Sequence, residues 1–263
     1  MRQSGELSFA IQTAKKAGAI LMKHFGKVSY SLKDKRSLLT KADMESEKFI
    51  IARIRKRFPG HAVIAEESGS SGASDFIWYI DPLDGTMNFA HGFPYFCVSM
   101  ALFHKNKPLT GVVYDPYNED LFYAERGEGA FLENRKHGIK GKISVSKTNK
   151  MDEALMCYCF GGGNEEIMRL AQIAGKFATL SQGTKVFNAL ALDACSVACG
   201  RIEACLVMRT NPWDIAAAGL ILEEAGGLLT TFGGSLWDLK SLDSGLVASN
   251  RNLHSRILEF LKD

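Results

Sequence analysis

Residues 81–89, Asp81-Pro82-Leu83-Asp84-Gly85-Thr86-Met87-Asn88-Phe89, are the most informative stretch of this chain. They follow an apolar run, residues 76–80, that is typical of a buried strand. Pro82 favours an extended Asp81 and a tight turn toward Asp84, and Gly85 lets its backbone N–H approach a ligand. Such a loop can bind a hard cation through oxygen atoms and an anion through N–H groups. By itself it could also be an ordinary turn between a strand and the next element.

The composition is that of an ordinary globular protein. The chain has 263 residues, of which 46% are hydrophobic and 23% charged, so we expect a single compact domain, 1–263. The net charge of +3 is too small to indicate a nucleic acid or an anionic membrane as partner. No run of 18 apolar residues predicts a membrane span, and the N-terminus lacks the apolar core of a signal peptide. The six cysteines are expected to be reduced thiols, which predicts a cytoplasmic protein.

The apolar periodicity divides the chain into two halves near residue 150. In the first half, helices are predicted over residues 6–26 and 44–58, and a strand over 61–65. An antiparallel meander over 96–103, 109–114, 121–124 and 130–132 follows. In the second half, strands at 155–160, 180–183, 203–207, 228–231 and 246–248 alternate with helices near 164–175, 187–199, 213–225 and 250–261. We therefore predict an α+β half, about 1–150, and an α/β half, about 151–263.

Carboxylates stand at the ends of several predicted elements. They are Asp43, Glu66, Glu67, Asp81, Asp84 and Asp214. One such acid is usually a helix cap, and this interpretation stays open for Asp43 and for Asp214, which follows Asn211 and Pro212. Several converging acids would repel one another unless a cation neutralised them. Oxygen ligands without a His/Cys cluster favour Mg²⁺ or Mn²⁺ over zinc, and the spacing fits neither an EF-hand nor a Walker loop.

Six motifs together resemble one known family. They are Leu39–Asp43, Ala65–Ser68, Trp78–Phe89, Gly111–Tyr114 and Pro212–Ala217 with Glu224–Gly227. In these motifs the sequence resembles the inositol monophosphatase family of Mg²⁺-dependent, lithium-sensitive sugar-phosphate phosphatases, from the first helix to the C-terminus. The resemblance implies a layered αβαβα sandwich of the type shared with fructose-1,6-bisphosphatase. It also implies a homodimer that hydrolyses a small phosphate ester.

The resemblance also assigns roles to individual residues. The implied metal ligands are Glu66, Asp81, the Leu83 carbonyl, Asp84 and Asp214. They would hold two or three Mg²⁺ ions, with Mn²⁺ as a substitute and Li⁺ and Ca²⁺ as inhibitors. Thr86 and Asp43 are expected to orient and deprotonate the attacking water, with Glu66 beside them, so no covalent phosphoenzyme is needed. Gly85 and Thr86 are the expected phosphate cradle, and Lys33 aligns with a basic residue of the loop before Asp43.

The substrate side departs from the family pattern. Val207 stands where inositol-hydrolysing members carry a glutamate, and Asn188-Ala189-Leu190 replaces Gly-Ser/Thr-Ala. Lys185 takes the place of a common arginine. With Asp84, Gly85, Thr86 and Asp214, these residues form the predicted substrate site, beside which Arg209 could meet a second phosphate. We therefore predict a phosphomonoesterase acting on a small sugar- or polyol-phosphate similar to inositol 1-phosphate. Fructose 1,6-bisphosphate, histidinol phosphate, 3′-phosphoadenosine 5′-phosphate and a non-catalytic regulatory or binding role stay open.

Overall fold

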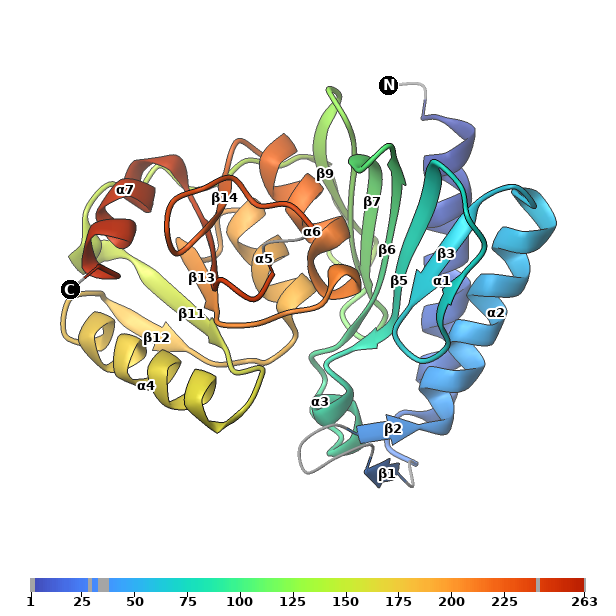
Figure 1. The fold of residues 1–263 in the computed structure, drawn as a ribbon, viewed down its shortest axis with the longest axis horizontal. Helices are drawn as coiled ribbons and strands as arrows, with labels where there is room; N and C mark the ends of the chain where they lie inside the picture. Colours follow the sequence, from blue (N-terminus) through green and yellow to red (C-terminus); the bar gives the residue numbers. More distant parts are fainter. Residues whose placement is uncertain (1–2, 28–29, 33–37, 240–241, 263) are drawn as a thin grey trace.

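Five layers of helices and sheets make up the protein (Figure 1). The computed structural model describes residues 3–27, 30–32, 38–239 and 242–262. Helices α1 (Gly5–His24) and α2 (Lys41–Arg57) form one outer layer, against an eight-stranded sheet. Helices α5 (Leu190–Ala198) and α6 (Pro212–Glu224) form the middle layer, followed by a five-stranded sheet. Helices α4 (Asn164–Ala178) and α7 (Arg251–Phe260) cover its far side. The predicted layered sandwich is confirmed.

The first helical layer forms where the apolar periodicity predicted it. The Ser4 hydroxyl accepts a hydrogen bond from the Leu7 N–H at 3.1 Å, so Ser4 is the expected N-cap of α1. Leu7, Ala14 and Leu21 recur at helical spacing and are fully buried against the sheet and α2. Each buried leucine side chain contributes about 1.5–3 kcal/mol to folding. These contacts hold the N-terminus of α2, which carries Asp43, against the end of the large sheet.

The eight-stranded sheet contains the predicted meander. Its strand order is β10-β9-β8-β7-β6-β5-β3-β4, and within the described part of this sheet only β3 and β5 pair in parallel. The strands are β3 (Ala62–Ala65), β4 (Gly69–Ser71), β5 (Phe76–Asp84), β6 (Cys97–His104), β7 (Lys107–Asp115), β8 (Asp120–Glu125), β9 (Gly129–Asn134) and β10 (Ile139–Lys142). The sequence did not predict β4 and β10, which are short and largely exposed. Such edge strands lack the apolar pattern that identifies a strand in sequence.

The second sheet and the middle helices follow the predicted alternation. The order is β12-β11-β13-β15-β14, built from β11 (Leu155–Cys159), β12 (Gly183–Lys185), β13 (Ala204–Val207), β14 (Leu228–Thr231) and β15 (Leu246–Ser249). Apolar side chains of both sheets pack around α5 and α6 in one core. Helix α6 approaches β7 so closely that a Cβ at Gly111 would lie 2.6 Å from the Ala217 carbonyl oxygen. Glycine is therefore required there, because any side chain would push the middle layer off the sheet.

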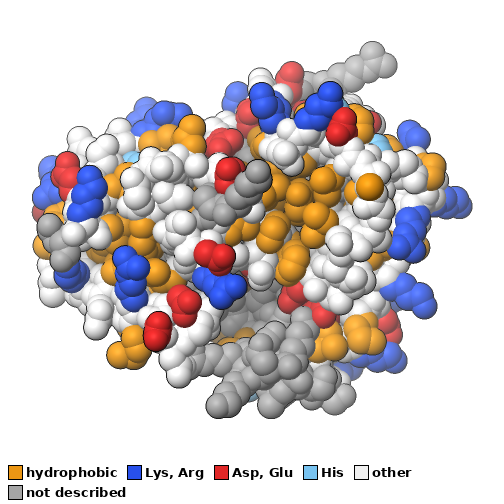
Figure 2. Space-filling model, viewed as in Figure 1, with side chains coloured by type: hydrophobic (Ala, Val, Ile, Leu, Met, Phe, Trp, Pro, Cys, Tyr) orange, Lys and Arg blue, Asp and Glu red, His pale blue; other side chains and the backbone are white. Residues whose placement is uncertain are grey.

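Shorter elements complete the chain. They are β1 (Tyr30–Leu32), β2 (Leu38–Thr40), α3 (Thr86–Ala90) and the 3₁₀ turn Met151–Glu153. Lys33 lies outside the described residues. The six cysteines are free thiols, as expected. No helix in the described ranges has the length and apolar character needed to cross a membrane. Figure 2 shows Lys and Arg side chains spread over one face among acidic and apolar ones.

Candidate active site

The loop at the end of β5 owes its geometry to one extra residue. In the pairing of β5 with β6, Asp81 is opposite Ser99, but Asp84 is opposite Cys97, so the register shifts between the two aspartates. In a regular strand, residues three apart point to opposite faces, whereas an added residue restores a common face. Both carboxylates line the same cavity. Pro82, which has no N–H to donate, lies within this irregular segment, where a strand tolerates proline.

Gly85 ends this strand and starts α3 in a conformation that favours glycine. Its φ is 85°, and a Cβ there would lie 2.9 Å from the Tyr95 carbonyl oxygen. The backbone can therefore turn from Asp84 directly into Thr86. The Thr86 hydroxyl lies 2.9 Å from the Leu83 carbonyl oxygen and 3.3 Å from Asp43 Oδ1. The loop and the start of α2 thus meet at one hydroxyl group.

Two further acids reach the cavity from other elements. Glu66 follows β3, which pairs in parallel with β5 so that Ala65 is opposite Ile80. This register places Glu66 beside Asp81. Asp214 lies in the first turn of α6, where its Oδ2 accepts hydrogen bonds from the Asn211 N–H at 2.8 Å and the Thr210 hydroxyl at 2.9 Å. Asp214 therefore caps its own helix and also lines the cavity.

Asp43 also has a structural task. Thr40 is the N-cap of α2, and Asp43 Oδ2 accepts a hydrogen bond from the Thr40 N–H at 2.8 Å. The carboxylate is fully buried, and its other oxygen faces Thr86. The cap interpretation of Asp43 is thus correct in part, since the same side chain also contacts the β5 loop. A helix start that fixes an acid against a hydroxyl is an arrangement suited to moving a proton.

Burial, together with the neighbouring carboxylates, makes Asp81 and Asp84 difficult to ionise. Burial raises the pKa of Asp81 well above its usual value, and the nearby Glu66, Asp84 and Asp214 raise it further. Burial and then Asp214 raise the pKa of Asp84 to about 8, although the Ala191 N–H, 2.8 Å from Asp84 Oδ2, partly offsets this. We call Glu66, Asp81, Asp84 and Asp214 the acidic wall. Its oxygen atoms are the donor type that divalent Mg²⁺ or Mn²⁺ binds, and such an ion would relieve the repulsion.

Another part of the cavity lining is apolar. It is formed by Cys159, Leu190 and Val207, which we call the apolar wall. Cys159 and Val207 are paired residues at the ends of the parallel strands β11 and β13, and Leu190 begins α5. Ligand sites are common at the carboxyl ends of parallel strands. The cavity encloses about 180 Å³ and is completed by Gly161, Arg209, Thr210 and Asn211.

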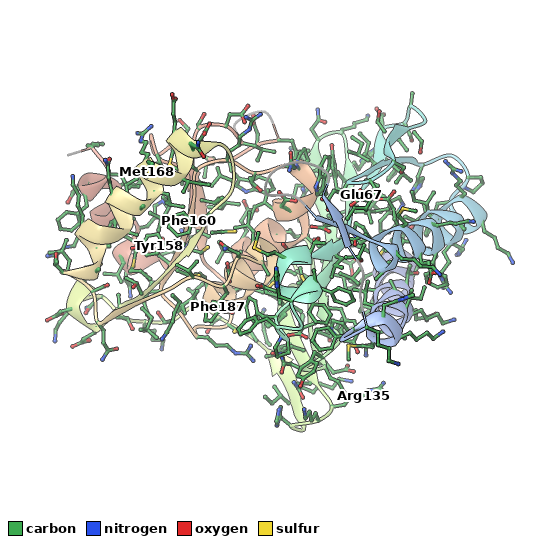
Figure 3. All side chains as sticks on the ribbon, turned by 90° about the horizontal axis from the view of Figure 1, so that it is seen from below. Glu67, Arg135, Tyr158, Phe160, Met168 and Phe187 are labelled. Carbon is green, nitrogen blue, oxygen red and sulfur yellow. The ribbon has the colours of Figure 1, made fainter. Side chains whose placement is uncertain are left out.

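Two predicted substrate residues lie elsewhere. Lys185 is exposed on β12. Asn188 is not among the described residues that line the cavity, and its Oδ1 accepts a hydrogen bond from the Phe160 N–H at 2.9 Å. This bond ties the exit of β11 to the segment before α5, where Phe160 and Phe187 are labelled in Figure 3. Sequence reasoning missed Cys159, whose place at the end of a predicted strand was the available signal. It also missed the Ala191 N–H that binds Asp84.

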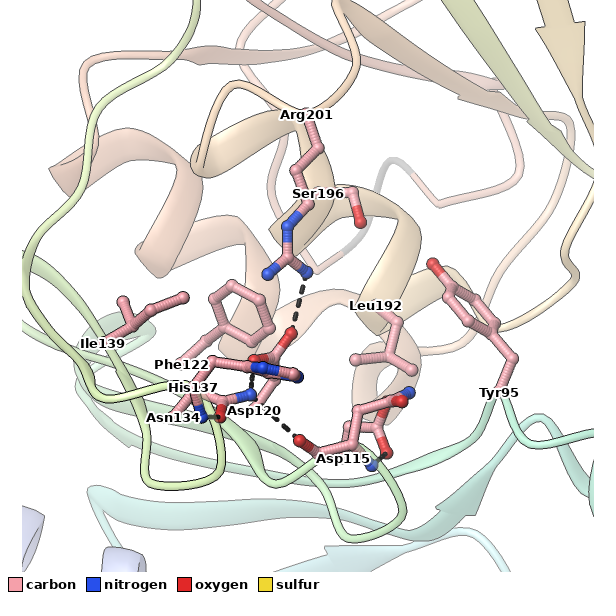
Figure 4. Close-up of a pocket in the computed structure, with 11 residues that line it drawn as sticks. Tyr95, Asp115, Asp120, Phe122, Asn134, His137, Ile139, Leu192, Ser196 and Arg201 are labelled. Carbon is pink, nitrogen blue, oxygen red and sulfur yellow. Dashed lines mark hydrogen bonds and ion pairs between the residues drawn. The ribbon is translucent and has the colours of Figure 1, made fainter.

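A second cavity, of about 250 Å³, lies apart from the acidic wall (Figure 4). Its charged groups already bind one another. The Arg201 guanidinium donates to Asp120 Oδ2 at 2.8 Å, and the amide of Asn134 donates to the other oxygen. Asp115 accepts hydrogen bonds from the backbone and the side-chain amide of Asn118. These closed pairs stabilise the turns of the meander, so we place the candidate active site at the acidic wall.

A buried cluster of Cys157, Asp193 and Cys205 lies behind the apolar wall. Cys157 and Cys205 are paired across β11 and β13, two residues before Cys159 and Val207. The pKa of the Cys205 thiol is raised well above its usual value, first by its hydrogen bond with Cys157 and then by burial. A thiol binds metal as the thiolate, so this environment disfavours a metal site. The cluster is better explained as packing beneath the cavity.

Comparison with known proteins finds relatives over nearly the whole chain. The family model "Inositol monophosphatase family" matches residues 3–263. An inositol-1-monophosphatase of Synechocystis is 36% identical over 97% of this chain and 88% of its own length. A putative Nus factor SuhB of Neisseria meningitidis is 33% identical over 97% of both chains. The solved structure of a Thermotoga maritima IMPase superposes with a TM-score of 0.89 and 31% identity, over 98% of this chain and 97% of that one. Since the family model spans residues 3–263 and these relatives are more than 30% identical over nearly the whole chain, the chain belongs to the inositol monophosphatase family.

Proposed function

We propose that the protein is a Mg²⁺-dependent phosphomonoesterase that hydrolyses a small phosphate ester at the acidic wall. The observation that carries this proposal is the convergence of Asp81, Asp84, Glu66 and Asp214 beside Gly85 and Thr86 in one cavity. Four carboxylates at one place cost folding free energy unless a cation compensates them. The family to which the chain belongs supports a phosphatase. The inositol-1-monophosphatase name of the Synechocystis relative supports the same class of reaction.

The residues of the cavity fit divalent metal ions. Glu66, Asp81, Asp84, Asp214 and the Leu83 carbonyl would hold two or three Mg²⁺ ions, with Mn²⁺ as a substitute. Bound there, the ions would lower the pKa of a water molecule and stabilise the leaving oxygen. We expect Li⁺ and Ca²⁺ to compete for these positions and inhibit. The backbone N–H of Ala191 donates to Asp84 Oδ2 and holds this carboxylate in place, so one ligand would be positioned before the ions bind.

The chain's own residues would position the water and the phosphate. The Thr86 hydroxyl lies between Asp43 and the Leu83 carbonyl, so it can accept a proton from water and pass its own proton to Asp43. The capping box with Thr40 fixes the Asp43 carboxylate for this task. The backbone N–H groups of Gly85 and Thr86 would orient the phosphate oxygens. Water would then attack phosphorus, the ester P–O bond would break, and the leaving oxygen would take a proton from solvent to become the alcohol, without a covalent phosphoenzyme.

The leaving alcohol would face the apolar wall. Val207 and Leu190 offer no acceptor to a sugar hydroxyl, so an inositol-like polyol would lose a hydrogen bond to a charged group, about 1.5–3 kcal/mol. Fructose 1,6-bisphosphate, histidinol phosphate and 3′-phosphoadenosine 5′-phosphate therefore stay beside inositol 1-phosphate as candidate substrates. The predicted homodimer and cytoplasmic location are part of the same proposal.

The direct test is phosphate release from a substrate panel with and without Mg²⁺. We expect activity that is lost in EDTA, restored by Mg²⁺, and lowered by at least about 10³-fold in Asp84→Asn, because several kcal/mol of charge stabilisation disappear. Glu133→Gln, on the distant strand β9, is the matched neutralisation of a carboxylate outside the cavity. Full activity of Asp84→Asn, or of wild type in EDTA, would refute the proposal.

A second candidate function comes from the Neisseria meningitidis relative, whose name is that of a putative Nus factor. It predicts a regulatory role that needs a protein or RNA partner and no hydrolysis. The discriminating variant is again Asp84→Asn. If the role is non-catalytic, this variant should restore the wild-type phenotype to a strain that lacks the gene, and if the role is hydrolysis it should not. We favour hydrolysis, because a binding role gives no reason for four buried or half-buried acids to share one cavity.

A further inference from the structure

The apolar wall lies directly beside the groups that would hold the scissile phosphate. Gly85 packs against the segment before α5, since a Cβ at Gly85 would lie 3.1 Å from the Ala189 Cβ. Further along this segment, the Ala191 N–H donates to Asp84 Oδ2 at 2.8 Å. Leu190 stands between these two contacts and lines the cavity. It therefore borders both the expected phosphate cradle and the acidic wall.

Val207 connects the apolar wall to the acidic wall a second time. It ends β13, opposite Cys159 at the end of β11. The segment that follows runs through Thr210, whose hydroxyl donates to Asp214 Oδ2 at 2.9 Å. Both ends of the apolar wall are thus tied by hydrogen bonds to carboxylates of the acidic wall. An alcohol esterified to a phosphate at the acidic wall would therefore cover the apolar wall.

The apolar wall is a fixed surface of the hydrophobic core. Val207 is 3% exposed and Leu190 is 5% exposed, and both belong to the core that surrounds α5 and α6. Val207 is also paired with Leu246 of β15, so that a strand flanks it on each side. Side chains in such a core are close-packed in rotamer minima and cannot swing away to admit water or a polar partner. A ligand therefore meets an aliphatic surface that does not rearrange.

The polar groups near the apolar wall already have partners. The Asn211 side-chain amide lies 3.3 Å from Asp214 Oδ2, which also accepts the hydrogen bond from Thr210. Arg209 Nε lies 2.9 Å from Asp243 Oδ1, and the arginine side chain is 59% exposed. A sugar hydroxyl that covered the wall would give up its water without gaining a comparable partner. An aliphatic group at the same place would gain free energy by leaving water.

We propose that the apolar wall selects phosphate monoesters of small aliphatic alcohols, in which an alkyl or alicyclic group stands where a polyol carries hydroxyls. The inference rests on the proposed function and assigns its substrate class. Leu190 and Val207 are the residues that determine this specificity. Water would supply the oxygen that joins phosphorus, the ester P–O bond would break, and the leaving oxygen would take a proton from solvent. The products are inorganic phosphate and an apolar alcohol.

The test compares two esters with the same carbon ring: cyclohexyl phosphate and inositol 1-phosphate. Cyclohexyl phosphate keeps the ring and the ester bond but has no free hydroxyls on the ring. Because the two leaving alcohols differ in acidity, affinity is measured separately from turnover, by calorimetry on Thr86→Ala with Mg²⁺. We expect this protein to bind cyclohexyl phosphate about tenfold more tightly or better, because one buried hydroxyl without a partner costs about that much.

Val207→Thr keeps nearly the same shape and adds one hydroxyl to the wall. Since the variant leaves both leaving alcohols unchanged, its effect on the ratio of kcat/KM, cyclohexyl phosphate over inositol 1-phosphate, reports the wall alone. The ratio should fall by about 3- to 10-fold, the usual effect of one neutral hydrogen bond. Val145→Thr is the matched control, because Val145 is half-buried and its N–H donates to the Ala225 carbonyl at the opposite end of α6 from Asp214. This exchange should leave the ratio unchanged.

A series of n-alkyl phosphates, from methyl to butyl, tests the wall without changing it. Each added CH₂ that covers the wall should raise the affinity of Thr86→Ala by about fourfold, the usual gain from burying one methylene. The gain should stop once the chain extends past the three side chains of the wall. If Val207→Thr does not fold, this series and the affinities for the two ring esters decide. Equal affinity along the series would overturn the inference.

Failure of this inference can be distinguished from failure of the proposed function. If wild type hydrolyses neither ring ester in Mg²⁺, the proposed function fails. Tighter binding of cyclohexyl phosphate and a stepwise gain along the alkyl series would then still support the apolar subsite. If both ring esters are hydrolysed, this inference alone fails when inositol 1-phosphate binds at least as tightly as cyclohexyl phosphate. It also fails when the ratio of kcat/KM is the same in Val207→Thr as in wild type.

Discussion

The two walls of the cavity are built in opposite ways. The acidic wall gathers carboxylates from β3, β5 and α6, and a shifted strand register brings two of them to one face. The apolar wall consists of side chains at the ends of β11 and β13 and at the start of α5. The first wall has buried charges that an ion must compensate, whereas the second has none. Under the proposed function, the reaction and the choice of substrate therefore lie on different segments, and we expect that they can be changed separately.

Thr86 tests whether the acidic side alone performs the chemistry. We expect Thr86→Ala to lower kcat by about 10²–10⁴-fold, the usual contribution of a positioned acid–base group, because the link from water to Asp43 is lost. Thr86→Ser keeps the hydroxyl and should retain most of the activity. Mg²⁺ affinity, followed by calorimetry, should change little in either variant. Unchanged kcat in Thr86→Ala would remove Thr86 from the mechanism.

Asp193, behind the apolar wall, makes the stability of the fold depend on pH. Burial raises its pKa to about 7, although the Tyr95 hydroxyl, 3.0 Å from Oδ1, and Cys157 partly offset this. In the unfolded chain the pKa is about 3.9. The folded state therefore binds the proton more tightly, so this group makes stability fall as pH rises from about 4 to about 7.

Asp193→Asn removes this dependence and keeps an acceptor for Tyr95. We compare the free energy of unfolding of the variant with that of wild type at each pH. By linkage, this difference should favour the variant by up to about 4 kcal/mol more at pH 8 than at pH 4. Urea unfolding in EDTA at several pH values measures this difference. Asp75→Asn, whose carboxylate is 67% exposed, is the control that should show no such trend. A pH-independent difference between Asp193→Asn and wild type would contradict the assigned pKa.

Mg²⁺ should stabilise the fold through the acidic wall only. An ion that binds the native state at 100 times its Kd adds about 2.7 kcal/mol to the free energy of unfolding. We expect this gain in wild type and in Val207→Ala, and a clearly smaller gain in Asp81→Asn at the same Mg²⁺ concentration. Thermal unfolding with and without Mg²⁺ measures it. An equal gain in all three proteins would place the ion elsewhere.

The sequence revealed the acidic wall more completely than the rest of the site. Glu66, Asp81 and Asp214 stand next to strands and helices whose periodicity is strong, so their positions at element ends could be predicted. The bulge between Asp81 and Asp84 could not, because it depends on the partner strand β6. Cys159 was missed as a lining residue, because a cysteine at the end of a strand is chemically ambiguous.

Contacts between segments that lie far apart in the chain could not be predicted from the sequence either. The ion pair of Arg209 with Asp243 joins the segment after β13 to a loop before β15, and no local sequence pattern predicts it. Edge strands β4 and β10 were missed because exposed residues carry little periodic signal. The roles of Lys185 and Asn188, inferred by counting positions, stay predictions. Local patterns specify elements, whereas the apolar wall depends on how those elements meet.

Val207→Glu gives the apolar wall the acceptor that it lacks. Hydrolysis of inositol 1-phosphate, relative to fructose 1,6-bisphosphate, should then rise by about tenfold, because one new bond from a hydroxyl to a carboxylate is worth about 1.5 kcal/mol. Val207→Ala enlarges the same space without adding a charge and is the matched control. An equal rise in both variants would mean that room, and not charge, had limited the polyol. A rise confined to Val207→Glu would show that the apolar wall sets the substrate while the acidic wall continues the same chemistry.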